Sequence, residues 1–348
     1  MKLFALLPAL ILPASGLDDI DYGAFTQTAT YSVASQLGFF AANGLNVTYL
    51  QVPNSTYGYS QLLSGGYDIL TGTIDNAVNL RFNANKTLTV LGQLDGGPDL
   101  VIASVPNITS VQQLRGKALM VDNAASGYAY VLRKVLSLYG LRLENGDYSF
   151  QVVGSTNIRY QYLANGSLPD GTAVYATILT YPFTAEGHAL NPPLTVLARI
   201  SDFINPFASS AFTISEPTLS DNNSRVLYTR FVASFMQASR FLAEPSNANC
   251  SIQAIARQLN ITTAVAQAEY AAATDSSTGE TISNSTFAVN RQGLLNVIDV
   301  RDQFSGFASV SQGFSFADAI VVGYGKLIDD SVRLAAMNIT PRATANTC

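Results

Sequence analysis

The sequence predicts an α/β protein of two lobes, each built on a doubly wound sheet. Short apolar strand patterns alternate with helix patterns between residues 20 and 200, and this alternation is typical of βαβ units. The order of strands and helices seen before residue 100 is repeated after residue 105, which indicates a second lobe of the same kind. With 348 residues, the chain is long enough to build two hydrophobic cores.

The first strand–helix–strand unit has the clearest pattern. Residues 20–25 form a candidate strand, and residues 31–43 carry apolar side chains at helical spacing. Gly44 follows in the position where glycine commonly ends a helix. Residues 45–52 then alternate, with the β-branched and aromatic content of a strand. These elements together predict the first unit of a doubly wound sheet.

The remaining elements follow from the same periodicities and breaks. In the first lobe we expect helices at 57–64 and from residue 75, with strands at 67–70, 87–94 and 100–105. In the second lobe we expect helices at 110–115, 128–139, 157–165 and 181–187, and strands at 117–121, 148–153, 172–178 and 194–200.

The strands at 100–105 and 194–200 are expected to cross between the lobes, as in proteins that close about a hinge. Residues 211–215 form a last strand. Helices are expected after it at 218–243, 251–259, 263–274 and 291–304, with one or two more over 316–336, and turns rather than linkers at 244–246 and 276–280.

The N-terminus has the features of a secretory signal peptide. Met1 and Lys2 precede an apolar run over residues 3–12, and small residues up to Gly16 resemble a cleavage site. A buried first helix is the alternative, but Pro8 and Pro13 disfavour it. We therefore expect residues 1–16 to be removed and the mature protein to be extracellular.

The charge pattern argues against nucleic acid and membrane insertion. The 19 Lys and Arg residues are scattered and the net charge is −5, so no basic surface is indicated. No second apolar stretch reaches membrane length, and the C-terminal residues 340–348 are polar. We expect a monomer that binds neither nucleic acid nor membrane.

Asn-x-Ser/Thr triplets are more frequent than the roughly four that chance would give. This excess indicates a eukaryotic secretory route with N-linked glycans. Asn46 is the least favourable acceptor because it lies on a predicted strand. The predicted glycosylation sites are Asn54, Asn85, Asn107, Asn165, Asn222, Asn249, Asn260, Asn284 and Asn338.

The two cysteines, Cys250 and Cys348, are expected to form one disulfide in an oxidising compartment. Two free thiols are the alternative. With two cysteines and a single histidine, the chain cannot build a zinc or iron site of the usual kind. We therefore expect no metal and no other cofactor.

Four loops at the carboxyl ends of predicted strands are the candidate binding site, because ligands of open α/β sheets bind there. These loops carry hydroxyl and amide groups and few charges, which suits a small polar or anionic ligand held by hydrogen bonds and helix dipoles. The alternative is that the same residues only cap helices. The candidates are Thr26, Thr28, Thr73, Asp75, Asn76, Asn123, Ser126, Tyr128, Thr180 and Tyr181.

Charged side chains near these loops have less specific interpretations. Asp75 and Asp122 could bind an amine or a pyrimidine nitrogen, although acids that open helices are commonly caps. Arg159 could reach a sulfonate or carboxylate, but we expect it on a solvated helix face. His188 is isolated in a polar loop, and no G-x-S-x-G motif is present. Catalysis is therefore not indicated.

Several segments occur in the order found in one family. They are the GFF…GL-V pattern around residues 38–47, QLLSGGYDILTG at 61–72, SVQQLRGKALMVDNAASG at 110–127, and the LANG turn with TAVYATILTYPF at 163–183. In this order the chain resembles the SsuA-like substrate-binding proteins of nitrate, sulfonate and taurine transporters, and the related fungal thiamine-pyrimidine synthases.

The resemblance implies a type II periplasmic-binding-protein-like fold whose C-terminal helices pack back on the first lobe. The expected divisions are a signal peptide (1–16), the first part of lobe 1 (17–105), lobe 2 (106–200), and the second part of lobe 1 with C-terminal helices (201–348). The implied function is binding of a small polar or anionic ligand, such as a sulfonate, nitrate or a pyrimidine-like molecule, between closing lobes.

Two other functions remain open. The thiamine-pyrimidine enzymes of this family use a cysteine-rich motif, a histidine and a lysine that binds pyridoxal phosphate, and none of these can be matched here. We therefore expect a non-enzymatic protein. The last alternative is a secreted interaction protein that has kept the fold without binding a ligand.

Overall fold

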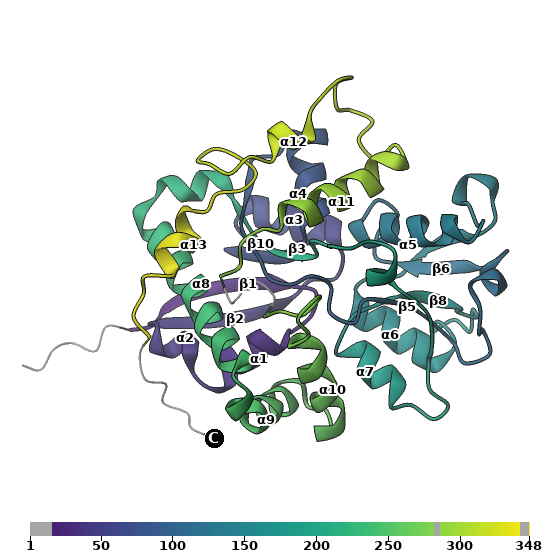
Figure 1. The fold of residues 1–348 in the computed structure, drawn as a ribbon, viewed down its shortest axis with the longest axis horizontal. Helices are drawn as coiled ribbons and strands as arrows, with labels where there is room; N and C mark the ends of the chain where they lie inside the picture. The colour runs from purple at the N-terminus through teal and green to yellow at the C-terminus, as the bar shows by residue number, and fades with distance from the viewer. Residues whose placement is uncertain (1–15, 282–285, 342–347) are drawn as a thin grey trace, which may run out of the picture.

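The computed structural model describes residues 16–281, 286–341 and 348, and it arranges them as two α/β lobes side by side (Figure 1). The first five-stranded sheet has the order β2-β1-β3-β10-β4, and the second has the order β7-β6-β8-β5-β9. The two-lobed α/β prediction is thus confirmed. The signal peptide and the Asn284 site lie outside the described residues, apart from Gly16 itself.

Each sheet is mixed, with one antiparallel strand in the fourth position. In the first sheet β1 pairs in parallel with β2 and β3, whereas β10 runs antiparallel to β3 and β4. The second sheet repeats this pattern with β5 as the antiparallel strand. The strands are β1 (Asp18–Ala24), β2 (Leu45–Gln51), β3 (Ile69–Thr73), β4 (Leu88–Gln93), β5 (Val101–Ser104), β6 (Ala118–Val121), β7 (Ser149–Val152), β8 (Ala176–Leu179), β9 (Thr195–Arg199) and β10 (Ser210–Ser215).

The chain returns to the first sheet later than expected. The strand at 194–200, here β9, pairs with β5 at the edge of the second sheet and does not cross back. The return is made by β10, which enters the first sheet between β3 and β4. Because β10 is buried on both sides, its residues 211–214 form a continuous buried run.

Helices cover both sheets. On the first lobe these are α1 (Ala29–Gln36), α2 (Phe39–Ala42), α3 (Ser55–Ser64), α4 (Ile74–Val78), α8 (Asn222–Ala243), α9 (Ala248–Leu259) and α13 (Ser331–Ala336). On the second lobe they are α5 (Gly127–Leu138), α6 (Thr156–Asn165) and α7 (Phe183–His188). The long α8 packs against α1, α2 and α13, so the C-terminal third of the chain does cover the first lobe (Figure 1).

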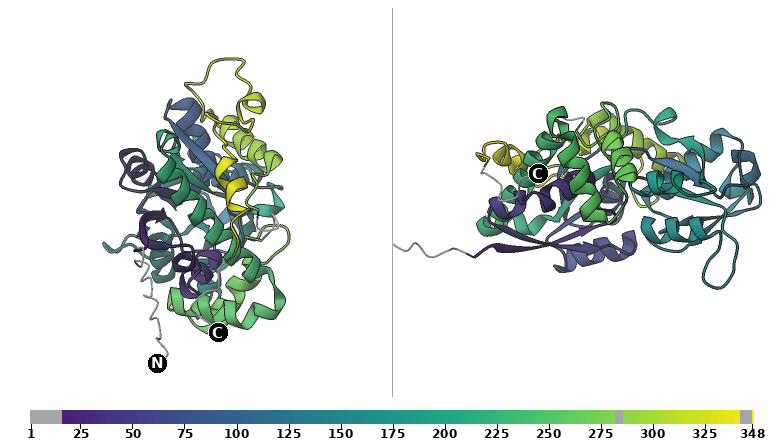
Figure 2. Two further views of the ribbon diagram at one scale, coloured as in Figure 1. Left: turned by 90° about the vertical axis from the view of Figure 1, so that its left-hand side faces the viewer. Right: turned by 90° about the horizontal axis from the view of Figure 1, so that it is seen from below.

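Two further C-terminal helices contact both lobes. α11 (Arg291–Gln303) packs against α4 of the first lobe and α5 of the second. α10 (Thr263–Ala273) packs against α9 and α1 on one side and against α7 on the other. Figure 2 shows the two lobes from below, with these helices near their junction. α12 (Phe316–Ala319) is a single turn next to α11.

One predicted helix is divided in the structure, and another segment forms the two short helices that the sequence allowed. The helix expected over residues 31–43 is interrupted at Gly38, which has a φ of 80°, so that α1 and α2 are separate. The one or two helices expected over 316–336 are two short ones, α12 and α13. Between them Val321, Val322 and Tyr324 are exposed, whereas Leu327 and Ile328 are buried.

Aromatic packing forms much of the first core. Tyr22 of β1 and Phe212 of β10 are fully buried against Phe231 and Phe235 of α8, with ring centroids 4.9–5.9 Å apart. Cys250 of α9 forms the expected disulfide with Cys348, which ties the C-terminal residue to the first lobe. Among the described residues, no helix is both long and apolar enough to cross a membrane.

Candidate functional site

A small buried cavity lies between the two lobes, with a volume of about 50 Å³. Loops at the ends of β1, β3 and β4 line it from the first lobe, and the N-terminal ends of α5 and α6 and the loop after β8 line it from the second. Eight of the ten candidate ligand-binding residues line this cavity, so the strand ends converge as expected: Thr26, Thr28, Thr73, Asn76, Ser126, Tyr128, Thr180 and Tyr181.

Some of these residues also cap helices. Thr28 is the N-cap of α1, and its Oγ1 accepts a hydrogen bond from the backbone N–H of Tyr31 at 3.1 Å. Ser126 is the N-cap of α5, and its Oγ accepts from the N–H of Ala129 at 3.4 Å. For these two side chains, the capping role that sequence alone left open is present in the structure.

Two buried hydroxyl groups of the cavity have no hydrogen-bond partner among the described residues. They are the Oγ1 of Thr73, at the N-terminus of α4, and the phenolic oxygen of Tyr181, which is 3% exposed. Buried hydroxyls in folded proteins are nearly always paired, because an unpaired one loses its hydrogen bonds to water. These two atoms therefore indicate where a ligand or a water molecule would bind.

Arg159 does not lie on a solvated helix face, as the sequence led us to expect. It is 2% exposed and extends from α6 into the wall of the cavity. Its guanidinium donates to the backbone oxygens of Gly154 and Ile178 and to the hydroxyls of Thr156 and Thr177 at 2.6–3.1 Å. Desolvation by burial lowers the pKa of Arg159, while the charge of Asp122 opposes that shift.

Two buried carboxyl groups also line the cavity. Asp122, 6% exposed, accepts a hydrogen bond from the N–H of Ser55 at 3.1 Å. Asp95, 3% exposed, accepts from the N–H of Gly97 at 2.8 Å. Burial raises the pKa of Asp95, and the hydrogen bond from Gly97 opposes this. Sequence reasoning did not select Asp95 because the Asp-Gly-Gly-Pro run reads as an ordinary turn.

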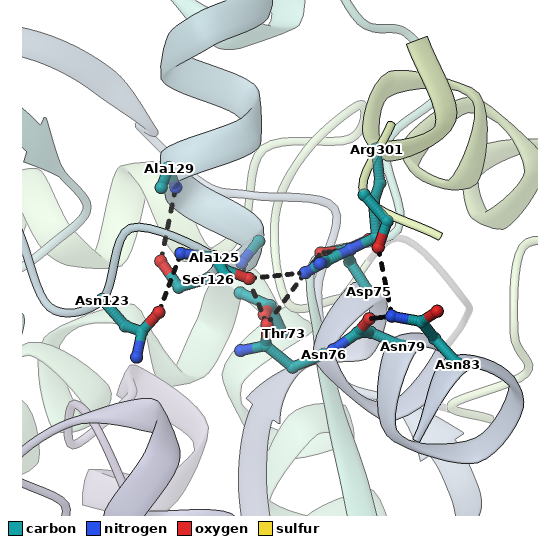
Figure 3. A network of polar contacts seen from close by, with 12 residues as sticks. Thr73, Asp75, Asn76, Asn79, Asn83, Asn123, Ala125, Ser126, Ala129 and Arg301 are labelled. Atoms are coloured by element: carbon teal, nitrogen blue, oxygen red, sulfur yellow. Dashed lines mark hydrogen bonds and ion pairs between the residues drawn. The ribbon is translucent and has the colours of Figure 1, made fainter. Parts of the chain in front are cut away.

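Asp75 lies outside the cavity lining because Arg301 of α11 binds it. Arg301 is 1% exposed, and its Nε donates to both carboxylate oxygens of Asp75 at 2.9 and 3.0 Å, while Nη2 donates to Oδ2 at 2.6 Å (Figure 3). Its Nη2 also donates to the backbone oxygen of Ala125 in the second lobe at 2.9 Å. Asp75 is thus held in a structural ion pair.

Asn123 also lies outside the cavity. Its Nδ2 donates to Thr56 of the first lobe at 2.8 Å, and its Oδ1 accepts from the N–H of Ala125 at 2.7 Å. It lines a wider groove of about 500 Å³ between α3 and the second lobe. Its contacts in this conformation fix its own loop against α3.

The two lobes are in close contact beside the cavity. The N–H of Gly127, at the start of α5, donates to Asn76 Oδ1 of the first lobe at 3.0 Å. A Cβ at Gly127 would lie 2.7 Å from Thr73 Oγ1 and 3.0 Å from Asp75 Oδ2. Glycine is therefore required for this close approach of the two lobes.

The chemistry of the lining is limited to hydroxyl, amide, carboxyl and guanidinium groups. None of the described residues that line the cavity is a lysine, histidine or cysteine. No group of three His, Cys, Asp or Glu side chains suited to a metal ion occurs in the described part of the chain. His188 lies at the end of α7 and is exposed, away from the cavity lining.

A family model described as "NMT1/THI5 like" matches residues 25–244 of the chain. No curated protein gives a significant sequence match.

Among solved structures, the chain is similar to the nitrate-binding protein NrtA of Synechocystis PCC 6803, with 12% identity and a TM-score of 0.69 over 92% of this chain and 89% of that one. It is also similar to the alkanesulfonate-binding protein SsuA of Xanthomonas axonopodis pv. citri, solved with MOPS, with 15% identity and a TM-score of 0.64 over 86% and 96%.

A third similar structure is a Candida albicans protein described as having the generic periplasmic binding protein fold. It shares 17% identity, with a TM-score of 0.62 over 95% of this chain and 99% of that one. These matches confirm the type II periplasmic-binding-protein-like fold and the resemblance to SsuA-like proteins.

Proposed function

The chain belongs to the NMT1/THI5-like family, and from that premise we propose that it binds one small polar molecule in the cavity between its lobes. The observation that carries this proposal is the pair of unpartnered buried hydroxyls, on Tyr181 and Thr73, which reach the cavity from opposite lobes. A ligand that pairs with both would bind the closed arrangement more tightly than the open one.

The similar structures give examples of such ligands. NrtA is a nitrate-binding protein, and SsuA is an alkanesulfonate-binding protein. The proposed binding function includes both neutral polar ligands and anionic ones. A volume of about 50 Å³ favours a molecule of a few non-hydrogen atoms, since one water needs roughly 10–15 Å³ on the same measure.

Secretion and glycosylation are part of the proposal. The proposed acceptor asparagines 85, 107, 165, 222, 249, 260 and 338 are all exposed, which glycan transfer requires. Asn54 is half-buried, and its side chain caps α3 by accepting from the N–H of Tyr57 at 2.8 Å, so it is the least accessible of the described acceptors. The disulfide between Cys250 and Cys348 suits an oxidising compartment.

The enzymatic branch of the family fits this chain less well. A pyridoxal-phosphate enzyme needs a lysine beside the cofactor, and none of the described cavity residues is a lysine. A cavity of about 50 Å³ also has no room for a phosphorylated heterocycle. We therefore propose a binding protein and assign no reaction.

Native mass spectrometry of the protein secreted by a eukaryotic host tests the proposal. We expect a mass above that of the polypeptide, which falls on enzymatic deglycosylation, and a small adduct that is lost on unfolding. A bare protein that also gains no thermal stability from nitrate, sulfonates, pyrimidines or small amines would contradict the binding function.

Tyr181→Phe should weaken ligand binding roughly fivefold, because it removes one hydrogen bond to the ligand, worth about 1 kcal/mol, and little volume. Isothermal titration with the ligand found by mass spectrometry gives the dissociation constant. Tyr160→Phe is the matched control, because Tyr160 is outside the cavity lining. If Tyr181→Phe and the wild type bind the ligand with equal affinity, the hydroxyl of Tyr181 makes no hydrogen bond to it.

A further inference from the structure

We infer that the ligand carries a positively charged N–H group, such as an ammonium or an amidinium, and that the carboxylate of Glu280 occupies the position where the first lobe could bind an anion. This inference rests on the proposed function and narrows its ligand class. It follows from the hydrogen-bond partners of the donors and acceptors around the cavity.

The first three backbone N–H groups of α1 are already paired. Glu280, fully buried in the segment between α10 and α11, accepts from the N–H of Ala29 at 3.1 Å and from the N–H of Thr30 at 2.7 Å. The next N–H, of Tyr31, donates to Thr28. A helix N-terminus binds a carboxylate of the protein in the same way as an external anion. Glu280 therefore occupies the anion position at the N-terminus of α1.

The donors of the second lobe are largely used as well. The N–H of Gly127 donates to Asn76, and that of Ala129 donates to Ser126. Arg159 has five N–H donors, and four of its hydrogen bonds go to its own lobe. The cavity thus offers an anion one guanidinium N–H as the only charged donor of its described lining, and its other side-chain donors are neutral hydroxyl and amide groups.

Acceptors, by contrast, remain available. Asp122 accepts one hydrogen bond, from the N–H of Ser55, whereas a carboxylate has about four acceptor sites. Asp95 accepts from the N–H of Gly97 and is also hydrogen-bonded by Ser210, so it has fewer sites left. When all three charged groups of the lining are ionised, two carboxylates face one guanidinium and the cavity has one net negative charge. In a buried site this charge favours a cation over an anion.

The cleanest test uses three probes of the same shape and different charge: acetamidinium, acetamide and acetate. Titration calorimetry on the secreted, deglycosylated protein should give acetamidinium at least tenfold higher affinity than the other two. Asp122→Asn should lower the affinity for acetamidinium at least tenfold and that for acetamide much less, because only acetamidinium loses a charge–charge attraction. Circular dichroism checks that the variant is folded, and Asp95→Asn serves in its place if it is not.

A second arm tests the role of Glu280. In Glu280→Ala, acetate can enter the space of the missing carboxylate, so acetate should raise the melting temperature of this variant by several degrees and leave the wild type unchanged. Acetamide is the control for non-specific stabilisation. If acetate stabilises both proteins equally, Glu280 does not occupy an anion position.

The outcomes separate the inference from the proposed function. If acetate, nitrate or methanesulfonate binds the wild type more tightly than acetamidinium, and Tyr181→Phe weakens that binding, the cavity is a binding site and the inferred charge is wrong. If acetamidinium and every anion fail to bind, and the secreted protein carries no adduct, both the inference and the proposed function are wrong.

Discussion

Arg301→Met should lower the free energy of unfolding by about 3–5 kcal/mol, because it leaves the carboxylate of Asp75 buried without its partner. Both side chains are almost completely buried, and the guanidinium makes three hydrogen bonds to the carboxylate. Arg301 also stacks over the ring of Tyr130 at 4.2 Å and donates to Ala125 across the cleft. Urea denaturation with the disulfide intact measures the loss.

The control for this prediction is an ion pair on the surface. Arg199 pairs with Asp99 at 2.7 Å, but its side chain is 53% exposed. Arg199→Met should therefore change the free energy of unfolding by less than about 1 kcal/mol. The double variant Asp75→Leu with Arg301→Met should recover part of the loss, because it removes both buried charges. A loss below 1 kcal/mol for Arg301→Met would contradict the view that the buried carboxylate of Asp75 depends on this partner.

Local sequence patterns predicted the elements of the fold because each depends on neighbouring residues. Hydrophobic periodicity and the positions of glycine residues predicted the strands and helices from β1 to β9. Eight of the candidate residues at the predicted strand ends line one cavity. The split at Gly38 was missed because the apolar spacing of α1 continues into α2, and only the backbone conformation shows the break.

The electrostatics of the site depend on contacts between residues far apart in the chain. Asp75 and Arg301 are 226 residues apart, and Glu280 meets Ala29 across 251 residues. No spacing rule connects such residues, so Asp75 was expected at the ligand and Glu280 was read as part of a turn. Arg159 was expected in solvent because an arginine on a helix usually lies on a solvated face, but its partners are backbone and hydroxyl oxygens, which no pattern in the sequence identifies.

The folded protein should be more stable at pH 5 than at pH 7.5, and Glu280 should account for up to about 3 kcal/mol of the difference. Burial raises the pKa of the Glu280 carboxyl from 4.5 to about 7, and the charge of Asp95 adds to this, against the hydrogen bonds from Thr30 and Ala29. Because the folded state binds this proton more tightly than the unfolded state, the free energy of unfolding falls as the pH rises from about 4.5 to 7.

Glu269 of α10 should act in the same direction. It is fully buried, neither of its carboxyl oxygens has a partner among the described residues, and burial, with the charge of Glu186 on α7, raises its pKa well above 4.5. Urea denaturation at pH 5 and pH 7.5 measures the total effect for the wild type. In Glu280→Gln, whose side chain cannot ionise, the difference in unfolding free energy between pH 5 and pH 7.5 should fall by the contribution of Glu280. In Glu269→Gln it should fall by the contribution of Glu269. If the wild type and Glu280→Gln show the same difference between the two pH values, Glu280 is ionised throughout this range, and its two backbone hydrogen bonds outweigh the cost of burying its charge.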